Sequence, residues 1–217
     1  MNQSLISHIQ QIGTGAAFIL IPLIFIFAFS VHPGLLKPCL LQPEEIIRRA
    51  WRNKWLQFGH VLVLLNTALL IVLAITFMNI ISQGNAAWAG MIGGVLAGLG
   101  AILLAADKGA LCLTMSALDT IPEEKFSAMM PGLLAMFSKK GWMILLWGII
   151  LLPAGFAIQA VCLLQGYALP SWQSALFLTG VLLVATPDGL EIINLSASIL
   201  MAIALIPYGI QLITTAF

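Results

Sequence analysis

Long uninterrupted runs of apolar residues dominate this chain, and polar residues collect in the short segments between them. A helix needs about 20 apolar residues to cross the hydrocarbon of a bilayer. Runs that approach this length, with no charge in their interior, lie near 12–31, 58–82, 86–106, 141–164, 172–186 and 190–214. The pattern therefore predicts an all-α fold, a polytopic membrane helix bundle with six transmembrane helices in a single integral membrane domain, 1–217.

Helices fit these runs better than the strands of a transmembrane barrel. Each run is continuously apolar, whereas barrel strands alternate between lipid-facing and lumen-facing residues with a period of two. The run at 172–186 is short for a complete span, although the apolar residues directly before it would lengthen it. No Lys or Arg precedes the first run and no small-residue cleavage site follows it, so we expect a retained helix rather than a signal peptide.

Two segments between the runs have the pattern of amphipathic helices that lie in the membrane interface. The first, near 44–57, places aromatic and apolar residues at spacings of three and four, with basic residues on the other face. Such a helix keeps its rings at headgroup depth and its cations near lipid phosphates. The residues expected to form this lipid anchor are Arg48, Arg49, Trp51, Arg52 and Trp55. A docking surface for a protein partner is the alternative.

The second amphipathic segment, near 122–138, has an apolar stripe formed by Phe126, Met129, Met130, Leu133, Leu134 and Phe137. Methionine and phenylalanine make adaptable contacts, so this stripe is one candidate for a partner-binding face. The favoured interpretation is that the segment packs beneath the bundle.

Composition excludes a water-soluble globule. Hydrophobic residues make up 61% of the chain and charged residues 8%, and the mean hydropathy is +1.06. No packed interior of this size hides so much apolar surface.

The basic residues predict the orientation in the membrane. All nine lie in two connections: Lys37, Arg48, Arg49, Arg52 and Lys54 in the first, and Lys108, Lys125, Lys139 and Lys140 in the second. The positive-inside rule then makes the long loops 32–57 and 107–140 cytoplasmic and leaves both termini outside. This predicts three helical hairpins joined on the cytoplasmic side of a membrane of the bacterial cytoplasmic type.

Two histidines are candidates for a cofactor site. His32 ends the first span and His60 begins the second, so they lie at the same depth on adjacent antiparallel helices. Two axial ligands of haem b would need this arrangement. No haem motif surrounds either residue, and hydrogen-bonded or solvated interfacial histidines are the alternative.

Polar residues near the cytoplasmic ends of the spans are candidates for a substrate cavity. They are Asn66, Asp107, Glu191, Asn194 and Ser198. Ionisable groups inside a membrane are costly and mark function, whereas an intramembrane Asn more often bonds to a neighbouring helix. We expect the third span to end at Asp107, with the following apolar stretch along the interface. The alternative is one long tilted helix that carries Asp107 and Lys108 into the bundle. Adjacent residues point about 100° apart on a helix, so we expect Asp107 and Lys108 not to pair with each other.

Small residues predict a close helix contact in the third span. Gly90, Gly94 and Gly98 recur every four residues, a pattern that lets two helix backbones approach each other. This face is the expected packing surface of that span.

These features narrow the possible functions but do not identify one. The three cysteines form no CxxC motif, and no phosphate loop, zinc-ligand spacing or serine elbow is present. The leading hypothesis is a non-catalytic membrane subunit or assembly protein. The alternatives are a small-molecule transporter or channel, and a haem- or quinone-linked redox subunit. The expected partners are bilayer lipid, with anionic headgroups at 44–58, and other membrane proteins or further copies of the chain, but not nucleic acid.

Overall fold

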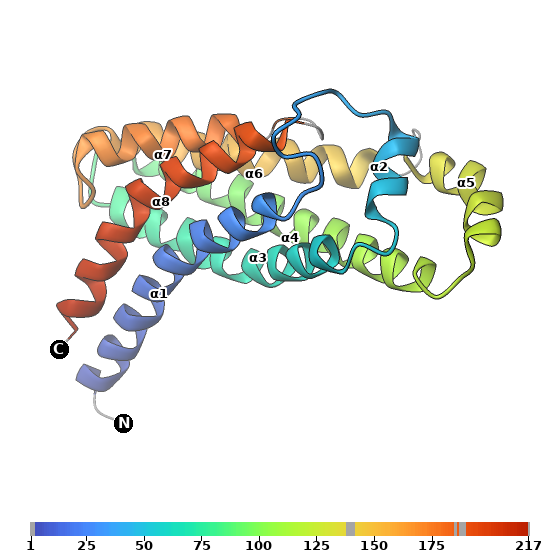
Figure 1. Cartoon of the computed structure of the whole chain (residues 1–217). Helices are drawn as coiled ribbons and strands as arrows, with labels where there is room; N and C mark the ends of the chain where they lie inside the picture. The colour runs from blue at the N-terminus through green and yellow to red at the C-terminus, as the bar shows by residue number, and fades with distance from the viewer. Residues whose placement is uncertain (1–2, 138–141, 185, 187–189, 217) are drawn as a thin grey trace.

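The computed structural model describes residues 3–137, 142–184, 186 and 190–216, and over these residues the chain is entirely helical, without a strand. Its eight helices in that part are α1 (Gln3–Ser30), α2 (Pro43–Ala50), α3 (Lys54–Ile81), α4 (Ala87–Leu118), α5 (Glu123–Phe137), α6 (Trp142–Leu163), α7 (Ser171–Leu183) and α8 (Glu191–Thr214). The long helices form a bundle, and the short α2 and α5 lie together at one end of it (Figure 1). Lys139 and Lys140, and position 185 within the predicted run 172–186, lie outside the described residues.

Four helices, α1, α3, α4 and α8, are long and apolar enough to cross a membrane. Two shorter apolar helices accompany them, α7 and the part of α6 from Trp147 to Leu163. The prediction of an all-α fold with long apolar helices that could cross a membrane is confirmed. The count of six spans and their arrangement in hairpins stay predictions.

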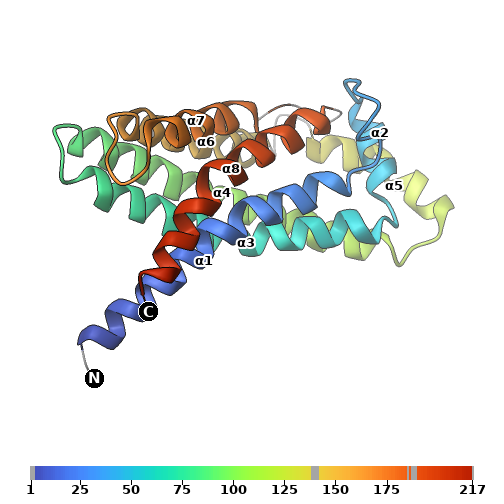
Figure 2. The same cartoon turned by 60° about the vertical axis from the view of Figure 1, so that its left-hand side comes forward.

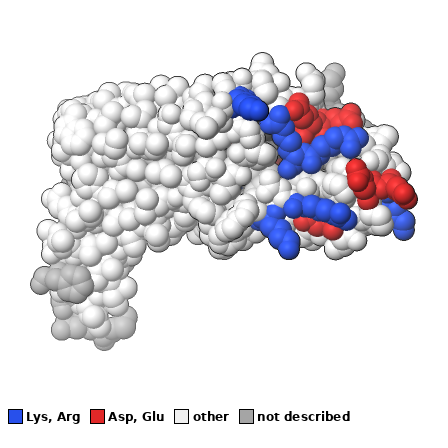
Figure 3. All heavy atoms as spheres, in the orientation of Figure 1, with Lys and Arg blue, Asp and Glu red and all other residues white. Residues whose placement is uncertain are grey.

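Charged side chains gather at one end of the molecule. Figure 3 shows Lys, Arg, Asp and Glu over α2, α5 and the neighbouring end of the bundle, while the rest of the visible face carries none among the residues it describes. α2 forms at this end because Pro43 occupies its first turn, where the missing N–H is not needed, followed by Glu44 and Glu45. Arg48 and Arg49 lie in its last turn. The acidic residues thus lie at the positive end of the helix dipole and the basic residues at its negative end, which stabilises α2.

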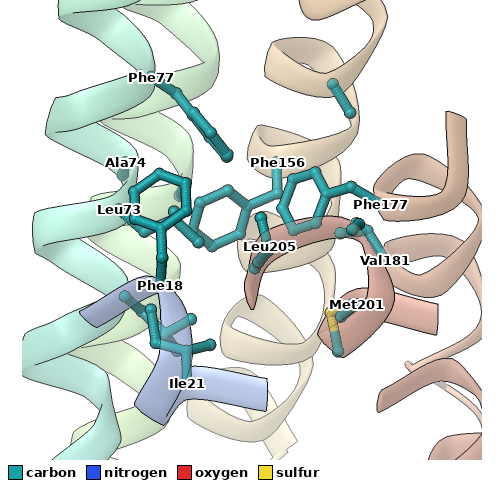
Figure 4. Packing of buried hydrophobic residues seen from close by; sticks show 14 of the residues in the cluster. Phe18, Ile21, Leu73, Ala74, Phe77, Phe156, Phe177, Val181, Met201 and Leu205 are labelled. Carbon is teal, nitrogen blue, oxygen red and sulfur yellow. The ribbon is translucent and has the colours of Figure 1, made fainter. Parts of the chain in front are cut away.

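Aromatic rings fill the centre of the bundle. Phe77 of α3 meets Phe18 of α1, Phe156 of α6 and Phe177 of α7 edge to face, with ring centroids 5.6, 6.4 and 5.3 Å apart (Figure 4). Edge-to-face pairs place the positive edge of one ring on the negative face of another. These contacts join helices from the beginning, the middle and the later part of the chain around one core.

Glycine residues of α4 bring it close to α6. A Cβ atom at Gly93 would lie 2.8 Å from the backbone oxygen of Gly155, and one at Gly100 would lie 2.6 Å from Cα of Leu152. Gly90 and Gly94 are buried too, against Ile81 and Met78 of α3. Gly98 differs from the prediction, because a Cβ there would meet nothing within 4 Å. Residues spaced by four drift around a helix of 3.6 residues per turn, so Gly98 has left the packed face.

α4 is one continuous helix through Asp107, and the expectation that it ends there is wrong. Its 32 residues extend about 48 Å at 1.5 Å per residue. That length exceeds the roughly 30 Å of bilayer hydrocarbon. The last part of α4 therefore reaches beyond the other long helices toward α5 (Figure 1).

The segment 44–57 is not one amphipathic helix. α2 ends at Ala50, Arg52 has a positive φ of 57°, and α3 begins at Lys54. The side chain of Asn53 caps α3 by accepting a hydrogen bond from the backbone N–H of Leu56 at 3.0 Å. The break places Trp51 and Trp55 on different elements, so they do not share one helical face.

α1 and α8 pack along each other and leave the bundle together. Gly15 and Gly209 face each other at this contact, since a Cβ on either would lie within 2.7 Å of the other's backbone oxygen. Each helix contains a proline, Pro22 in α1 and Pro207 in α8. Figure 2 shows the outer ends of the pair projecting away from the other helices. Proline removes a hydrogen bond inside a helix and permits such a bend.

Candidate functional site: a cavity at the charged end

A cavity of about 350 Å³ lies at the charged end of the bundle. Its walls come from the residues after α1, from α2, from the first turns of α3, from the last part of α4, from α5 and from the start of α8. Most of the wall is apolar, with Ile47, Leu56, Leu111, Met115 and Leu133 among its residues. Because α4 continues past Asp107, it supplies one complete side of this cavity.

Six ionisable side chains also line the cavity in the described part of the chain. They are His32, Arg49, His60, Asp107, Lys108 and Glu191. These residues come from five separate segments, so only the folded bundle brings them together. Both histidines of the predicted cofactor site and two of the five predicted substrate residues are in this set.

His32 and Glu191 form the most buried of these contacts. Nδ1 of His32 lies 3.2 Å from Oε1 of Glu191, and the two side chains are 16% and 5% exposed. The contact connects the residues after α1 with the first turn of α8. Glu191 is well placed there because a carboxylate is stabilised at a helix N-terminus.

His60 lies against His32. The ring centroids are 5.7 Å apart and the ring planes are at 80°, which is an edge-to-face contact. His60 makes no hydrogen bond within the described part of the chain, whereas Nδ1 of His32 is occupied by Glu191. The predicted proximity of the two histidines is therefore present, but the rings touch each other directly. The haem hypothesis stays an untested alternative, which a spectrum tests.

Asp107 and Lys108 pair with each other, so the expectation that they would not is wrong. Nζ of Lys108 lies 3.2 Å from Oδ2 of Asp107. The long lysine side chain spans the difference in direction between two adjacent helical positions. Both side chains are mostly buried, at 21% and 15% exposure, and together they place a neutral ion pair in the cavity wall.

Arg49 connects α2 to the loop that follows α1. Its Nη2 lies 2.5 Å from Oε1 of Glu45, and its Nη1 donates a hydrogen bond to the backbone oxygen of Pro33 at 3.3 Å. Gly34 lies beside this guanidinium with a positive φ of 85°. A Cβ at Gly34 would lie 2.6 Å from Nη1 of Arg49, so glycine gives the arginine its space.

α2 and α5 meet through an aromatic stack beside the cavity. The rings of Trp51 and Phe126 are 4.5 Å apart and 7° from parallel. Nε1 of Trp51 donates to the backbone oxygen of Leu118 at 3.0 Å, and the guanidinium of Arg52 lies 4.4 Å from the Trp51 ring. Ile47, Phe126, Met130 and Leu133 form a small buried cluster around this stack. We call α2, α5 and this cluster the roof of the cavity.

The roof changes the interpretation of the predicted lipid anchor. Trp51 and Arg52 contact protein, and the backbone N–H of Arg52 donates to Oδ1 of Asp119 at 2.6 Å. Within the described residues Arg48 pairs with Glu44 of its own helix, and Trp55 is 66% exposed. Among the five anchor residues, Arg48, Arg52 and Trp55 are exposed, as lipid contact requires, and Arg49 and Trp51 are partly buried. In α5, the residues Phe126, Met130 and Leu133 are buried and pack together with Ile47 of α2.

Three of the five candidate substrate residues do not line this cavity. Asn66 donates to the backbone oxygen of Ile21 at 3.3 Å, and Ser198 donates to the backbone oxygen of Asn194 at 2.8 Å. The Asn194 side chain lies 2.8 Å from the hydroxyl of Thr186. These three side chains bond within the bundle, while Asp107 and Glu191 line the cavity.

Two polar residues with structural roles escaped the sequence analysis. Gln159 is fully buried and donates to the backbone oxygens of Ala74 and Gly90 at 2.9 and 3.3 Å, so it joins α6 to α3 and α4. The one sign of this role in the sequence was that Gln159 carries an amide inside the apolar run 141–164. Asp119 accepts hydrogen bonds from Arg52 and from the side chain of Gln57. It fixes the connection between α2 and α3 to the end of α4.

No group of three His, Cys, Asp or Glu side chains within the described ranges is arranged to hold a metal ion. Comparison of the chain with protein-family models, with curated proteins and with solved structures found no match. The cavity and its ionisable lining are therefore the basis for any assignment of function.

Proposed function

We propose that this chain is a non-catalytic integral membrane protein that binds a small amphiphilic molecule in the cavity at its charged end. The observation that carries the proposal is the cavity of about 350 Å³, whose wall is largely apolar but includes a compact group of ionisable side chains. Ligand sites have this volume and this mixture of apolar wall and few polar groups. A molecule with a hydrocarbon part and a polar head matches both parts of the lining.

The proposed topology is six spans in three hairpins, with the charged end in the cytoplasm. The two helices of each proposed hairpin contact each other, α1 with α3, α4 with α6 and α7 with α8, which is compatible with this arrangement, although α3 with α4 and α1 with α8 are in contact too. The clustering of charge at one end supports the same orientation through the positive-inside rule (Figure 3). The cavity would then lie at the cytoplasmic boundary of the hydrocarbon, where amphiphiles partition.

Binding is favoured over conduction by the polar residues outside the cavity. A path across the bundle would need polar side chains that face it along its length. Asn66 and Ser198 instead donate to backbone oxygens, and Gln159 bridges three helices. The proposal thus develops the hypothesis of a non-catalytic membrane subunit and adds a ligand to it.

The test uses Trp51, which lines the cavity. The other tryptophans are replaced by phenylalanine, and the full chain in lipid nanodiscs is titrated with an amphiphile whose hydrocarbon chain carries bromine. Bromine quenches tryptophan only at short range. Binding in the cavity predicts quenching that saturates at a low mole fraction of the amphiphile.

Matched variants separate the cavity from the lipid. Ala110 lines the cavity on α4, whereas Ala117 is exposed on the same helix and does not line it. Ala110→Phe should abolish the saturable phase by filling the space, and Ala117→Phe should leave it unchanged. Quenching of Trp51 that rises in proportion to the mole fraction, equally in both variants, would reject the proposal.

A further inference from the structure

We infer that the cavity selects an amphiphile with an uncharged, hydrogen-bonding head group, and that His60 is the residue that binds this head. The inference rests on the proposed binding function and names the chemical class of its ligand. Long-chain glycerol esters and quinones share this chemistry. Two observations carry the inference: the pairing of the charged groups in the cavity wall and the unused hydrogen-bonding capacity of His60.

The charged groups of the described wall are already paired within the protein. Arg49 and Lys108 supply two positive charges, and Asp107 and Glu191 supply two negative charges. Each of these four already has a partner in the protein: Arg49 has Glu45, Lys108 has Asp107, and Glu191 has His32. A charged head group would leave water without finding a free counter-charge. Burying an unpaired charge in an apolar site is strongly unfavourable, so this wall disfavours both carboxylate and ammonium heads.

His60 is the lining group with hydrogen-bonding capacity to offer. Its ring nitrogens have no hydrogen-bond partner in the part of the chain that the structure describes. They are also not sealed in, since the inaccessible partnerless polar atoms there are Oδ1 of Asn66 and Oε1 of Gln159. A neutral imidazole has one donor and one acceptor, so it pairs with a hydroxyl or a carbonyl.

The surrounding wall fits the rest of such a ligand. His60 lies in the first turns of α3, and Leu111 and Met115 of α4, with Leu133 of α5, supply apolar wall. The head would meet His60 and the hydrocarbon part would lie under the roof. The contact between His32 and Glu191 keeps His32 occupied and leaves His60 for the ligand.

The experiment compares head groups on one chain. Brominated amphiphiles of equal chain length, with a glycerol ester, a carboxylate or a trimethylammonium head, are titrated against the protein that keeps Trp51 alone. We expect the glycerol ester to bind at least about tenfold more tightly than either charged amphiphile. A quinone with the same chain, measured by competition against the glycerol ester, distinguishes the two sources of a neutral head.

Variants of His60 test its role. His60→Leu removes both nitrogens, and the loss of one hydrogen bond should weaken binding of the glycerol ester about tenfold. His60→Gln keeps a donor and an acceptor and should retain most of the affinity. His8→Leu is the matched control, because His8 is exposed near the beginning of α1 and far from the cavity in sequence and in fold.

Each outcome has a separate consequence. Tighter binding of the carboxylate or the ammonium amphiphile would overturn the inference and leave the binding function standing. Equal affinity of His60→Leu and His8→Leu for the glycerol ester would overturn the role of His60. Failure of every head group to give saturable quenching would remove the proposed function itself. The ranking of head groups needs no change at His60, so it decides the inference even if His60→Leu does not fold.

Discussion

The contact between α4 and α6 gives a sharp test of the packing, because α4 carries a packed and an open glycine two residues apart. A Cβ at Gly98 would meet no atom within 4 Å, whereas a Cβ at Gly100 would meet the backbone of Leu152, with its Cα at 2.6 Å. Alanine at each position therefore adds the same methyl group to two different environments. Backbone atoms cannot turn aside as a flexible side chain does, so the two helices must separate at Gly100.

The expected magnitudes follow from two opposing effects. Replacing glycine by alanine inside a helix stabilises it by up to about 1 kcal/mol, and this gain applies at both sites. Forcing an extra group into a filled contact costs about 1–3 kcal/mol. Gly98→Ala should thus be neutral or stabilising, and Gly100→Ala should have a free energy of unfolding about 1–3 kcal/mol lower than that of Gly98→Ala.

The assay is reversible unfolding of the purified protein in mixed micelles with an increasing fraction of a denaturing detergent, followed by circular dichroism. Gly155→Ala provides a second test from the α6 side, since its Cβ would lie 2.8 Å from Cα of Ala97. Free energies of unfolding for Gly98→Ala and Gly100→Ala that agree within about 0.5 kcal/mol would refute the close approach of these helices.

Four further predictions concern topology, the roof and the cofactor. In a variant without native cysteines, a cysteine near Tyr167 should react with an impermeant reagent from outside, and one near Ser127 only after permeabilisation; the opposite pattern would reverse the orientation. Trp51→Ala should destabilise the roof by about 2–3 kcal/mol, from a ring pair, a cation–π contact and a hydrogen bond, and Trp55→Ala by less than about 1 kcal/mol, measured by limited proteolysis of α5. Arg52→Gly should be more stable to heat than Arg52→Ala by about 1 kcal/mol, because glycine adopts a positive φ without strain; a lower melting temperature for the glycine variant would contradict this. The purified protein should show no Soret band, and a band that shifts on reduction would restore the haem hypothesis.

The long helices could be predicted from the sequence because each one consists of apolar residues over most of its length. The continuation of α4 past Asp107 could not, since the apolar stretch that follows suits an interfacial segment and a longer helix equally well. Tertiary contacts at the end of α4 decide between these two structures. Leu118 accepts a hydrogen bond from Trp51, and Asp119 accepts from Arg52, so the end of α4 is held by a segment more than sixty residues earlier.

The small-residue face illustrates the same limit within one helix. Spacing by four selected Gly90, Gly94 and Gly98, and the first two are buried against α3. A helix with glycine on several faces can pack against two neighbours, and the sequence of α4 alone does not name the second one. Gly93 faces Gly155 of α6, and Gly100 faces the backbone of Leu152.

The basic residues between α1 and α3 show why charge predicted the location of the site but not its chemistry. The density of charge marked the end of the bundle where the cavity lies, because charged groups avoid the hydrocarbon. Their partners are set by the fold. Arg49 binds Glu45 and the backbone oxygen of Pro33, and the guanidinium of Arg52 donates to the backbone oxygen of Ile121, after α4, and lies over the ring of Trp51. Cations that are already paired attract anionic lipid less strongly than free ones. Pairing within the protein therefore weakens the attraction of this segment to anionic lipid. It also leaves the charged groups of the cavity wall without a free charge to offer, which is why an uncharged head group fits there.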